Sequence, residues 1–336
     1  MIRCRFLFIC LTLSIGLSSV LAHAKDQPAT STKMPFARWV QTIKQKARAK
    51  GISMDTLKKA FHKVTHPLEK IIKLDRNQPE IKLTFDEYYE GRVPVLIPKG
   101  KKLAHKYRTL LANMQKKYNV PKEVIVALWG RETNYGGFVG KTPTIHALAT
   151  LAWDGRREKF FTEELFHALH ILEEGHIPPD RLVGSWAGAI GQCQFMPSSF
   201  HRDAVDSTGK GRKDIWSTLP DVFASTGNYL QKAGWNPKVP CVYEVILPKE
   251  NHPSSMDLKQ TKTLGEWEKL GLKRKNGKPL KNKTLHAALI KPEKSTRAFL
   301  VFENIHVILN WNRSLNFALS VGLLANEIHG GELEYV

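Results

Sequence analysis

The hydrophobic pattern of the chain changes near Gly234, and this change constrains the fold more than any other feature. Before this point, apolar residues recur at the three- and four-residue spacing that is typical of amphipathic helices. After it come short β-rich runs over 242–247, 285–290 and 298–309, which are separated by turns that carry Lys, Asn and Gly. A helical pattern returns over 314–329. The sequence therefore predicts a mostly helical α+β fold with a small sheet inserted late in the chain.

Helices are predicted wherever this spacing persists over two or more turns. They cover 36–51, 54–64, 101–118, 121–135, 143–152, 158–174, 196–205, 220–233 and 264–270. Ser53 is a suitable N-cap for the second of these, because its hydroxyl accepts a hydrogen bond from an open backbone N–H. Residues 65–100 contain several prolines, so we expect a connection there with one short helix near 85–89. The basic residues of 101–118 are typical of a solvated helix face.

The first 24 residues have the features of a secretory signal peptide. Arg3 and Arg5 precede an apolar run over 6–20, and Ala22-His23-Ala24 supplies the small residues of a cleavage site. Cleavage is predicted after Ala24, and residues 25–33 are expected to form a flexible terminus of the mature chain. The apolar run has 15 residues, whereas a membrane span needs about 20. We therefore expect an exported protein without a transmembrane anchor.

The chain is strongly basic, with 51 Lys and Arg against 31 Asp and Glu. Signal cleavage removes two arginines and lowers the net charge from +20 to +18. A cytosolic protein of this charge would suggest nucleic acid as its partner. An exported protein meets anionic envelope polymers instead, for example a glycan that carries carboxylates, so nucleic acid is not an expected partner. A role of the charge in solubility alone is the alternative.

The cysteines and histidines indicate no metal centre. Cys193 and Cys241 remain after signal cleavage, and they either form one disulfide or stay as buried free thiols. The 13 histidines form no H-E-x-x-H pair, and the chain has no paired CxxC motif. Glycine motifs for nucleotides are also missing from the sequence.

Glu132 is the strongest candidate for a catalytic residue. Val124, Leu128 and Glu132 recur at a spacing of four on the predicted helix over 121–135, so the carboxyl continues an apolar side of that helix. Apolar surroundings favour the protonated form of a carboxyl group, which suits a general acid that protonates a glycosidic oxygen. The alternative is an ordinary charge at a helix end, paired with the neighbouring Arg131.

A glycine-rich loop over 184–191 and the segment after it are suited to binding sugars. The glycines allow a ligand to approach the backbone closely. Ser185 and Gln194 can exchange hydrogen bonds with sugar hydroxyls, while Phe195 and Met196 offer apolar surfaces to the sugar faces. The alternative is a loop that is packed tightly for structural reasons.

Several segments in the same order resemble one family of enzymes. They are WGRETNYGGFVGKTPTIHALATLAWDGRR, GSWAGAIGQCQFMPSSF and NWNRSLNFALSVGLLA, together with FARWVQTIKQKARAKGISMDTLKKAF and LDRNQPE near the N-terminus. The chain resembles the lytic murein transglycosylase B family (glycoside hydrolase family 103) from about Phe36 onward. The resemblance implies a lysozyme-like helical catalytic core, an extra helical domain and a small inserted β domain. The expected divisions are an N-terminal helical region (34–120), the core (121–235), the β-rich domain (236–310) and a C-terminal helix returning to the core (311–336).

The resemblance also implies a reaction and one catalytic residue. Members cleave the β-1,4 bond between N-acetylmuramic acid and N-acetylglucosamine in peptidoglycan and leave 1,6-anhydro-muramyl ends. The family's glutamate in the W-G-x-E-T motif corresponds to Glu132, which would first donate a proton and then accept one. Ordinary glycosidases need a second carboxylate, but an attacking hydroxyl of the sugar itself makes it dispensable. The nearby Asp154, Glu163 and Glu164 are accordingly interpreted as surface charges.

Substrate contacts are implied at seven further positions. These are Ser185, Gln194, Tyr229, Trp311, Asn312, Arg156 and Arg157. The serine and the glutamine would contact the sugars, and the aromatic rings and the asparagine would line the cleft. The two arginines would hold the carboxylates of the peptide stem. The alternatives are that Tyr229 and Trp311 belong to the core and that the arginines form a solvated pair.

The sequence departs from the family at two places. Some members carry an EF-hand-like calcium loop, which corresponds here to 206–214, but Lys210 stands where an acidic ligand is expected and Arg212 adds a second positive charge. We therefore expect no tight calcium site and no other cofactor; the Lys210 ammonium is a candidate substitute for the cation. The second departure is Gln192-Cys193, where members often have an aromatic residue and glycine.

The sequence thus predicts a periplasmic lytic transglycosylase that acts on peptidoglycan strands, with cell-wall synthases as candidate partners. Two alternatives remain at this point. One is a muramidase that uses water in place of the sugar hydroxyl, and the other is an envelope protein that binds glycan without cleaving it.

Overall fold

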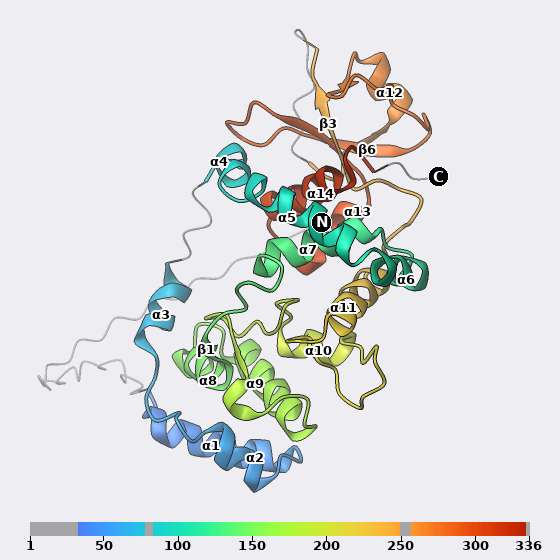
Figure 1. Cartoon of the computed structure of the whole chain (residues 1–336). Coiled ribbons are helices and arrows are strands. Elements are labelled where there is room, and N and C mark those ends of the chain that lie inside the picture. Colours follow the sequence, from blue (N-terminus) through green and yellow to red (C-terminus); the bar gives the residue numbers. More distant parts are fainter. Residues whose placement is uncertain (1–32, 78–82, 249–256, 334–336) are drawn as a thin grey trace, which may run out of the picture. The chain divides into compact units, whose positions relative to one another are not determined.

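The computed structural model describes residues 33–77, 83–248 and 257–333 (Figure 1). The predicted signal peptide (1–24), all but the last residue of the predicted flexible terminus (25–33) and Gln78-Pro79-Glu80 lie outside the described residues. The chain divides into residues 1–34 and a compact unit of residues 35–336, which contains every helix and strand described below. No helix in the described part combines the length and apolar character needed to cross a membrane.

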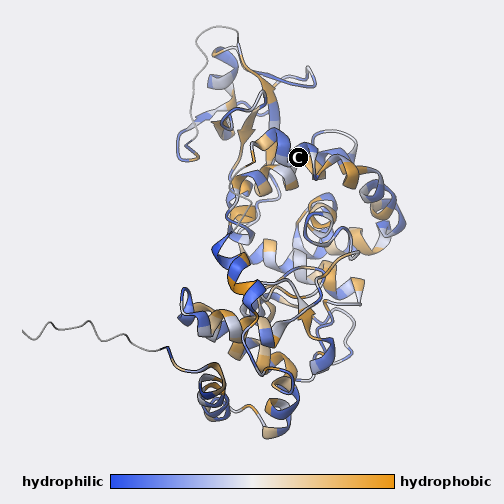
Figure 2. Ribbon diagram, turned by 90° about the vertical axis from the view of Figure 1, so that its left-hand side faces the viewer, coloured by the Kyte–Doolittle hydropathy of each residue, from blue (hydrophilic) through white to orange (hydrophobic). Residues whose placement is uncertain are grey.

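Helices make up most of the compact unit. In order they are α1 (Phe36–Ala49), α2 (Met54–Ala60), α3 (Glu69–Arg76), α4 (Phe85–Glu90), the 3-10 turn η2 (Pro94–Leu96), α5 (Ile97–Lys106), α6 (Arg108–Tyr118), α7 (Lys122–Thr133), α8 (Thr144–Asp154), α9 (Glu158–Glu173), the 3-10 turn η3 (Pro179–Arg181), α10 (Pro197–Asp203), α11 (Leu219–Lys232), α12 (Leu264–Lys269), α13 (Asn304–Trp311) and α14 (Leu315–His329). Most of them have a hydrophobic and a hydrophilic side (Figure 2), as expected of helices that cover a shared core.

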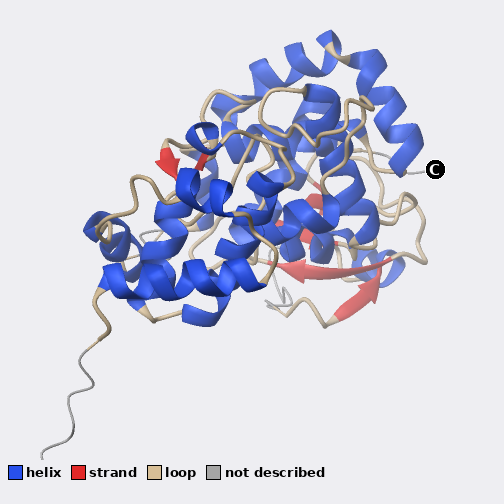
Figure 3. Cartoon of the chain, turned by 90° about the horizontal axis from the view of Figure 1, so that it is seen from below, coloured by secondary structure: helices blue, strands red, loops and turns tan. Residues whose placement is uncertain are grey.

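The strands form two sheets. They are β1 (Thr142–Pro143), β2 (Val183–Gly184), β3 (Val242–Ile246), β4 (Thr261–Thr263), β5 (Lys273–Arg274), β6 (His286–Ile290) and β7 (Ala298–Val301). β1 and β2 pair with each other, and the other five form an antiparallel sheet in the order β4-β6-β7-β3-β5. The fold is thus mostly helical with a small antiparallel sheet, as predicted (Figure 3).

The central strands of the larger sheet, β6 and β7, are buried on both faces. Phe299 and Val301 of β7 point into the helical core, whereas the alternate residues Ala298 and Leu300 join a second cluster that includes Trp267 of α12. This alternation follows from the two-residue period of a strand. The sheet therefore attaches to the helices through one face, while α12 covers the other (Figure 1).

Helix α7 lies at the centre of the helical core. Nearly all of its side chains from Glu123 to Gly130 are buried, and α14, α5, α6 and α11 pack around it. A helix that is buried on all sides has no room to shift along its axis. At Gly130, for example, an added Cβ would lie 2.7 Å from the ring of Tyr135.

Most predicted helices and strands are confirmed, with boundaries that differ by a few residues. Ser53 caps α2 as predicted, since its Oγ accepts a hydrogen bond from the Thr56 N–H at 3.2 Å. The predicted single helix over 101–118 is wrong. It is two helices, α5 and α6, which meet at Tyr107, whose ring packs against Trp129 and Phe223 of the core. The predicted divisions after residues 120, 235 and 310 stay a prediction.

The prediction of a strand-like run over 298–309 is also wrong in its second half. β7 ends at Val301 and α13 begins at Asn304. The fully buried Asn304 side chain accepts a hydrogen bond from the Asn236 N–H and donates to the carbonyls of Asn236 and Val239. These bonds hold the start of the helix, and a short apolar run does not reveal such a partner 68 residues away.

The connection predicted over 65–100 contains the additional helix α3, which is held by tertiary contacts. Ile71 and Ile72 are buried, and the Asp75 carboxylate accepts hydrogen bonds from Arg156 Nε and Nη2 and from Arg157 Nη2 at 2.5–2.6 Å. Burial alone would raise the pKa of Asp75, but the two guanidinium groups outweigh it, so this pKa lies below its ordinary value.

This geometry predicts that Asp75→Asn lowers the free energy of unfolding at neutral pH. It also predicts that the free energy of unfolding of the variant depends less on pH in the acidic range. A carboxyl group with a lowered pKa stabilises the fold above its unfolded-state pKa near 3.8 and loses that contribution as the pH falls through the folded-state value. Because both arginines are partly exposed, we expect a loss of about 1–3 kcal/mol at neutral pH. Urea denaturation between neutral pH and pH 3 measures both effects.

Asp55→Asn is the matched control for this prediction. Its carboxylate pairs with Lys59 at 2.5 Å on the exposed surface of α2, where an ion pair contributes at most about 0.5 kcal/mol. Equal losses in the two variants would contradict the assignment of a structural role to Asp75.

Candidate active site

Glu132 stands at the last turn of α7, where the helix ends abruptly. The helix stops after Thr133, and Asn134 and Tyr135 both adopt left-handed backbone conformations, with φ of 50° and 59°. The helix predicted over 121–135 therefore ends two residues earlier than expected. Asparagine tolerates the left-handed region, and the buried Tyr135 is held there by a hydrogen bond from its hydroxyl to the Leu96 carbonyl at 2.8 Å.

The Glu132 side chain is half-buried and faces Trp311. The indole Nε1 of Trp311 donates a hydrogen bond to Glu132 Oε1 at 2.6 Å. Arg131, the alternative partner considered from the sequence, donates to the Tyr88 hydroxyl at 2.8 Å and lies over the ring of Phe317. The carboxylate is thus oriented by a neutral donor, the indole N–H of Trp311.

Trp311 belongs to an aromatic wall that borders a groove. Its ring centroid lies 4.7 Å from that of Tyr229 and 5.2 Å from that of Phe195. All three line a cavity of about 610 Å³, together with Gln194 and Met196. Tyr229 and Trp311 also pack against the core. They therefore fit both interpretations made from the sequence, as core residues and as residues of the cleft.

The glycine-rich loop is closed by its own hydrogen bonds. The Ser185 N–H donates to the Ala189 carbonyl at 2.8 Å, and Ser185 Oγ accepts from the Ala189 N–H at 3.0 Å. Gly184 pairs with Thr142 in the small β1–β2 sheet. Gly140 fits against this strand because a Cβ there would overlap the Gly184 carbonyl. Ser185 is therefore held in a fixed place, with its side chain half-exposed.

Gln194 is held in an unusual backbone conformation beside the groove. Its φ is 49°, and its side-chain Nε2 donates to the carbonyls of Val139 at 3.2 Å and Gly191 at 3.0 Å. Among the described residues, none donates a hydrogen bond to its Oε1. This oxygen is an acceptor for a sugar hydroxyl at the position that the sequence predicted.

Arg156 and Arg157 are both solvent-exposed, as the alternative interpretation has it, but each also has a buried partner. Both donate to the carboxylate of Asp75, and each keeps part of its side chain exposed. They border a cavity of about 860 Å³ whose lining shares Phe160 and Glu164 with the groove at Tyr229. Asp75 was missed in the sequence, because its distance of 81 residues from Arg156 gives no local signal.

Two of the three acidic residues that were predicted as surface charges, Glu164 and Asp154, have structural partners. Glu164 is buried, and its carboxylate accepts from Ser198 N at 2.9 Å and Ser198 Oγ at 2.6 Å, so it caps the start of α10. Asp154 pairs with Arg76 at 2.8 Å, with only 4% of its side chain exposed. The prediction of surface charges is therefore wrong for these two residues and correct for Glu163. Their partners lie on other helices and are invisible in the local pattern.

Asn312 has a structural contact at the turn between α13 and α14. Its Oδ1 accepts a hydrogen bond from the Ser314 N–H at 3.0 Å. The side chain is half-buried next to Trp311. The structure thus brings Glu132, Trp311 and Asn312 together at the end of α13. A direct contact between Asn312 and a sugar stays a prediction.

The Gln192-Cys193 departure lies behind the groove. Gln192 is largely buried, and its Oε1 accepts from Trp129 Nε1 at 2.7 Å while its carbonyl accepts from Thr133 Oγ1. It therefore ties the loop to α7, a role that sequence reasoning missed. Cys193 and Cys241 are buried free thiols, and burial raises the pKa of each to about 12.

The carboxylates in the loop over 206–214 and next to it accept hydrogen bonds from nearby groups of the chain. Asp206 accepts hydrogen bonds from Thr208, the Lys210 N–H and the Gly211 N–H. Asp221 accepts from the backbone N–H groups of Ser207 and Asp214. The Lys210 side chain is exposed. In the described part of the chain no three His, Cys, Asp or Glu side chains are grouped as metal ligands.

Comparison with known proteins relates this geometry to one family. The family model described as "Transglycosylase SLT domain" matches residues 35–326. A curated relative, membrane-bound lytic murein transglycosylase B of Escherichia coli (strain K12), is 39% identical over 132 residues, which cover 39% of this chain and 36% of that protein. The match thus spans about a third of that relative's length.

Solved structures match over most of the chain. SltB3 from Pseudomonas aeruginosa, in complex with NAG-anhNAM-pentapeptide, is 39% identical with a TM-score of 0.83, covering 89% of this chain and 80% of that one. The lytic transglycosylase Slt35 of Escherichia coli, in complex with calcium, is 27% identical with a TM-score of 0.73, covering 88% and 93%. On these matches the chain belongs to the transglycosylase SLT domain family and, as the sequence motifs predicted, to its lytic murein transglycosylase B members.

Proposed function

We propose that this chain is a lytic transglycosylase that cleaves the β-1,4 bond between N-acetylmuramic acid and N-acetylglucosamine in peptidoglycan. The observation that carries the proposal is a single oriented carboxylate, Glu132, beside an aromatic-walled groove. Family membership supports it, as do the titles of two SltB3 structures, which name complexes with NAG-NAM-pentapeptide and NAG-anhNAM-pentapeptide.

In the proposed reaction Glu132 donates one proton to the substrate and then accepts one from it. The Glu132 carboxyl group protonates the glycosidic oxygen as the bond from the muramyl C1 to that oxygen breaks. The muramyl C6 hydroxyl then attacks C1, and its proton returns to Glu132. The new C6–O–C1 bond closes the 1,6-anhydro ring, so the enzyme ends in its starting state and no water is consumed.

The other carboxylates at the groove support a mechanism with one catalytic carboxyl group. Glu164 caps α10, and Asp203 accepts a hydrogen bond from Arg202 Nε at 2.9 Å. A nucleophile or a base opposite the acid would need a carboxylate free to face the sugar. The two alternatives, a muramidase that uses water and a non-catalytic glycan-binding protein, are not favoured by the family or its solved members.

The groove supports binding of both sugar faces and sugar hydroxyls. Tyr229 and Trp311 offer ring surfaces, and Gln194 offers a hydrogen-bonding group. Ser185 does not line this groove, so its contact with a sugar stays a prediction. The exposed parts of Arg156 and Arg157 carry positive charge toward a stem carboxylate.

We also propose that the chain acts in the periplasm after signal cleavage behind Ala24, with cell-wall synthases as candidate partners. The signal motif supports export, and the Escherichia coli relative is described as membrane-bound.

Glu132→Gln is expected to lower the rate of peptidoglycan cleavage by about 10²- to 10⁴-fold, because it keeps the shape of the side chain and removes the transferable proton. The measurement is release of muropeptides from purified sacculi, with mass spectrometry of the products. Wild type should yield products one water lighter than reducing-end muropeptides.

Glu268→Gln serves as the control, because Glu268 is an exposed glutamate on α12, away from both cavities. A Glu132→Gln variant that digests sacculi as fast as wild type would remove Glu132 from the mechanism. Products with reducing ends alone would instead identify a hydrolytic muramidase.

Trp311→Phe is expected to keep the ring wall and lose the donor to Glu132. The poorer orientation of the carboxylate should lower kcat on purified sacculi by about tenfold. An unchanged kcat would restrict Trp311 to packing.

We propose that the loop over 206–214 holds no calcium tightly. The carboxylates of Asp206 and Asp221 are already used by backbone N–H groups, and Lys210 and Arg212 add positive charge. Calorimetric titration of chelator-treated protein should show no micromolar binding of calcium. Slt35, whose structure is titled as a calcium complex, is the comparison protein, and similar heats of binding in the two would refute the proposal.

A further inference from the structure

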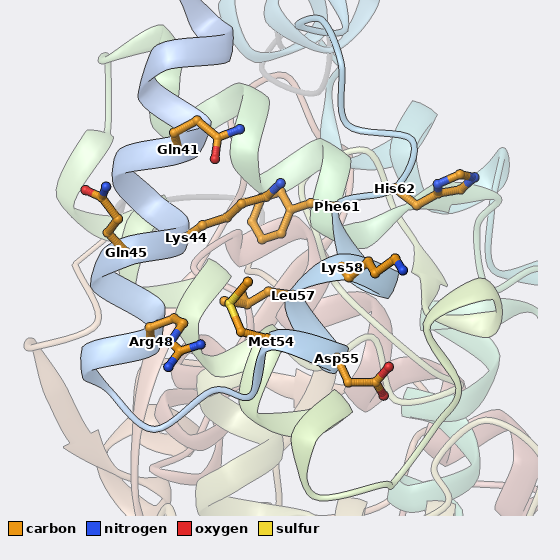
Figure 4. Close-up of a pocket in the computed structure, with 10 residues that line it drawn as sticks. All are labelled: Gln41, Lys44, Gln45, Arg48, Met54, Asp55, Leu57, Lys58, Phe61 and His62. Atoms are coloured by element: carbon orange, nitrogen blue, oxygen red, sulfur yellow. The ribbon is translucent and has the colours of Figure 1, made fainter.

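A third cavity lies between α1 and α2, away from the groove at Trp311. It has a volume of about 810 Å³ and shares no lining residue with the groove or with the cavity at Arg156 (Figure 4). Nothing in the proposed reaction uses it.

The lining of this cavity combines cations, amides and an apolar floor. Gln41, Lys44, Gln45 and Arg48 of α1 follow the spacing of one helix face, which extends over about 10 Å. Opposite them, α2 and its C-cap contribute the buried side chains of Leu57 and Phe61 and the exposed Lys58. Figure 4 shows Lys44 reaching over Phe61, with its Nζ 5.3 Å from the ring centroid.

The positive charges of this cavity are not neutralised by the protein. In the described part of the chain no carboxylate pairs with Lys44, Arg48 or Lys58. Asp55, the acidic residue of the lining, pairs with Lys59 instead. The surrounding segment is also basic, because residues 33–76 contain twelve Lys and Arg but three Asp and Glu. An anionic ligand would therefore meet a local excess of positive charge.

The shape and chemistry favour an acidic peptide over a lipid surface. An extended chain advances about 3.3–3.6 Å per residue, so roughly three residues span the face of α1. The amides of Gln41 and Gln45 can bond a peptide backbone, and the apolar floor can take its side chains. A membrane-inserting patch would need several exposed apolar side chains, whereas Met54 is the strongly exposed apolar residue of this lining.

We propose that the α1–α2 cavity is a second peptidoglycan site, which binds the acidic peptide stem of a strand that is not being cleaved. The inference rests on the proposed function for the class of ligand. A contact of this kind holds the enzyme on the insoluble wall and raises the local concentration of strands at the groove.

The test removes the three cations from the full-length chain and measures binding to purified sacculi. Lys44→Gln, Arg48→Gln and Lys58→Gln are combined in a Glu132→Gln background, so that the sacculi are not digested. Co-sedimentation should show about tenfold weaker binding at low salt, with the difference shrinking as salt screens the charges. Sacculi whose stem carboxylates are converted to amides should show no difference between the two forms.

The matched control removes three exposed cations elsewhere. Lys101→Gln, Lys102→Gln and Lys116→Gln lie on α5 and α6 and make the same change in net charge. Thermal melts of both triple variants verify folding. If both triple variants bind sacculi equally weakly, the effect comes from the overall charge and the proposal is overturned. Unchanged binding of the α1–α2 triple variant would also overturn it.

Two further measurements separate the possible outcomes. With Glu132 intact, the α1–α2 triple should raise KM on sacculi and leave kcat and the anhydro products unchanged. Loss of binding to phosphatidylglycerol vesicles without loss on sacculi would assign the cavity to a lipid surface and overturn the proposal. Absence of anhydro products from wild type would refute the proposed function alone, since the sacculus-binding result does not depend on cleavage.

Discussion

The hydrogen bond from the Trp311 indole to Glu132 is the contact around which the site is organised. It joins residues 179 positions apart, the end of α13 and the last turn of α7. For it to form, the chain must leave the sheet at Val301, start α13 at the buried Asn304 and return through α14 against α7. The inserted sheet thus acts on the site indirectly, by setting where α13 begins.

The polar groups around the groove are largely occupied in holding the fold. Glu164 caps α10, Asp75 binds two arginines and Gln192 ties a loop to α7. Buried carboxylates of this kind need partners, because an unpaired charge in the interior is costly. Once these partners are assigned, Glu132 is distinguished by a neutral donor on one oxygen and a position beside the aromatic wall. At the α1–α2 cavity, by contrast, no carboxylate of the described residues pairs with Lys44, Arg48 or Lys58.

Much of the secondary structure was predictable because its causes are local. The spacing of apolar residues marked α1, α7, α9 and α14, and Ser53 marked the start of α2. The errors fall where distant contacts decide the outcome. The helix predicted over 101–118 is interrupted at Tyr107, whose ring packs against the core, and the contacts of Asp75 with Arg156 and Arg157 hold α3 in place.

The sequence by itself determined the mostly helical class with a late sheet, the family, and the identity of the candidate acid, since these depend on local periodicity and on motifs that are contiguous in the chain. Only the tertiary structure decided what each polar residue touches. In the structure the side chains of Glu164 and Asp154, predicted as surface charges, are buried and paired. Gln192-Cys193 lies behind the groove, and Trp311 donates to Glu132. The physical reason is that the partner of a buried polar group is chosen by three-dimensional packing, which carries no signature in the residues next to it.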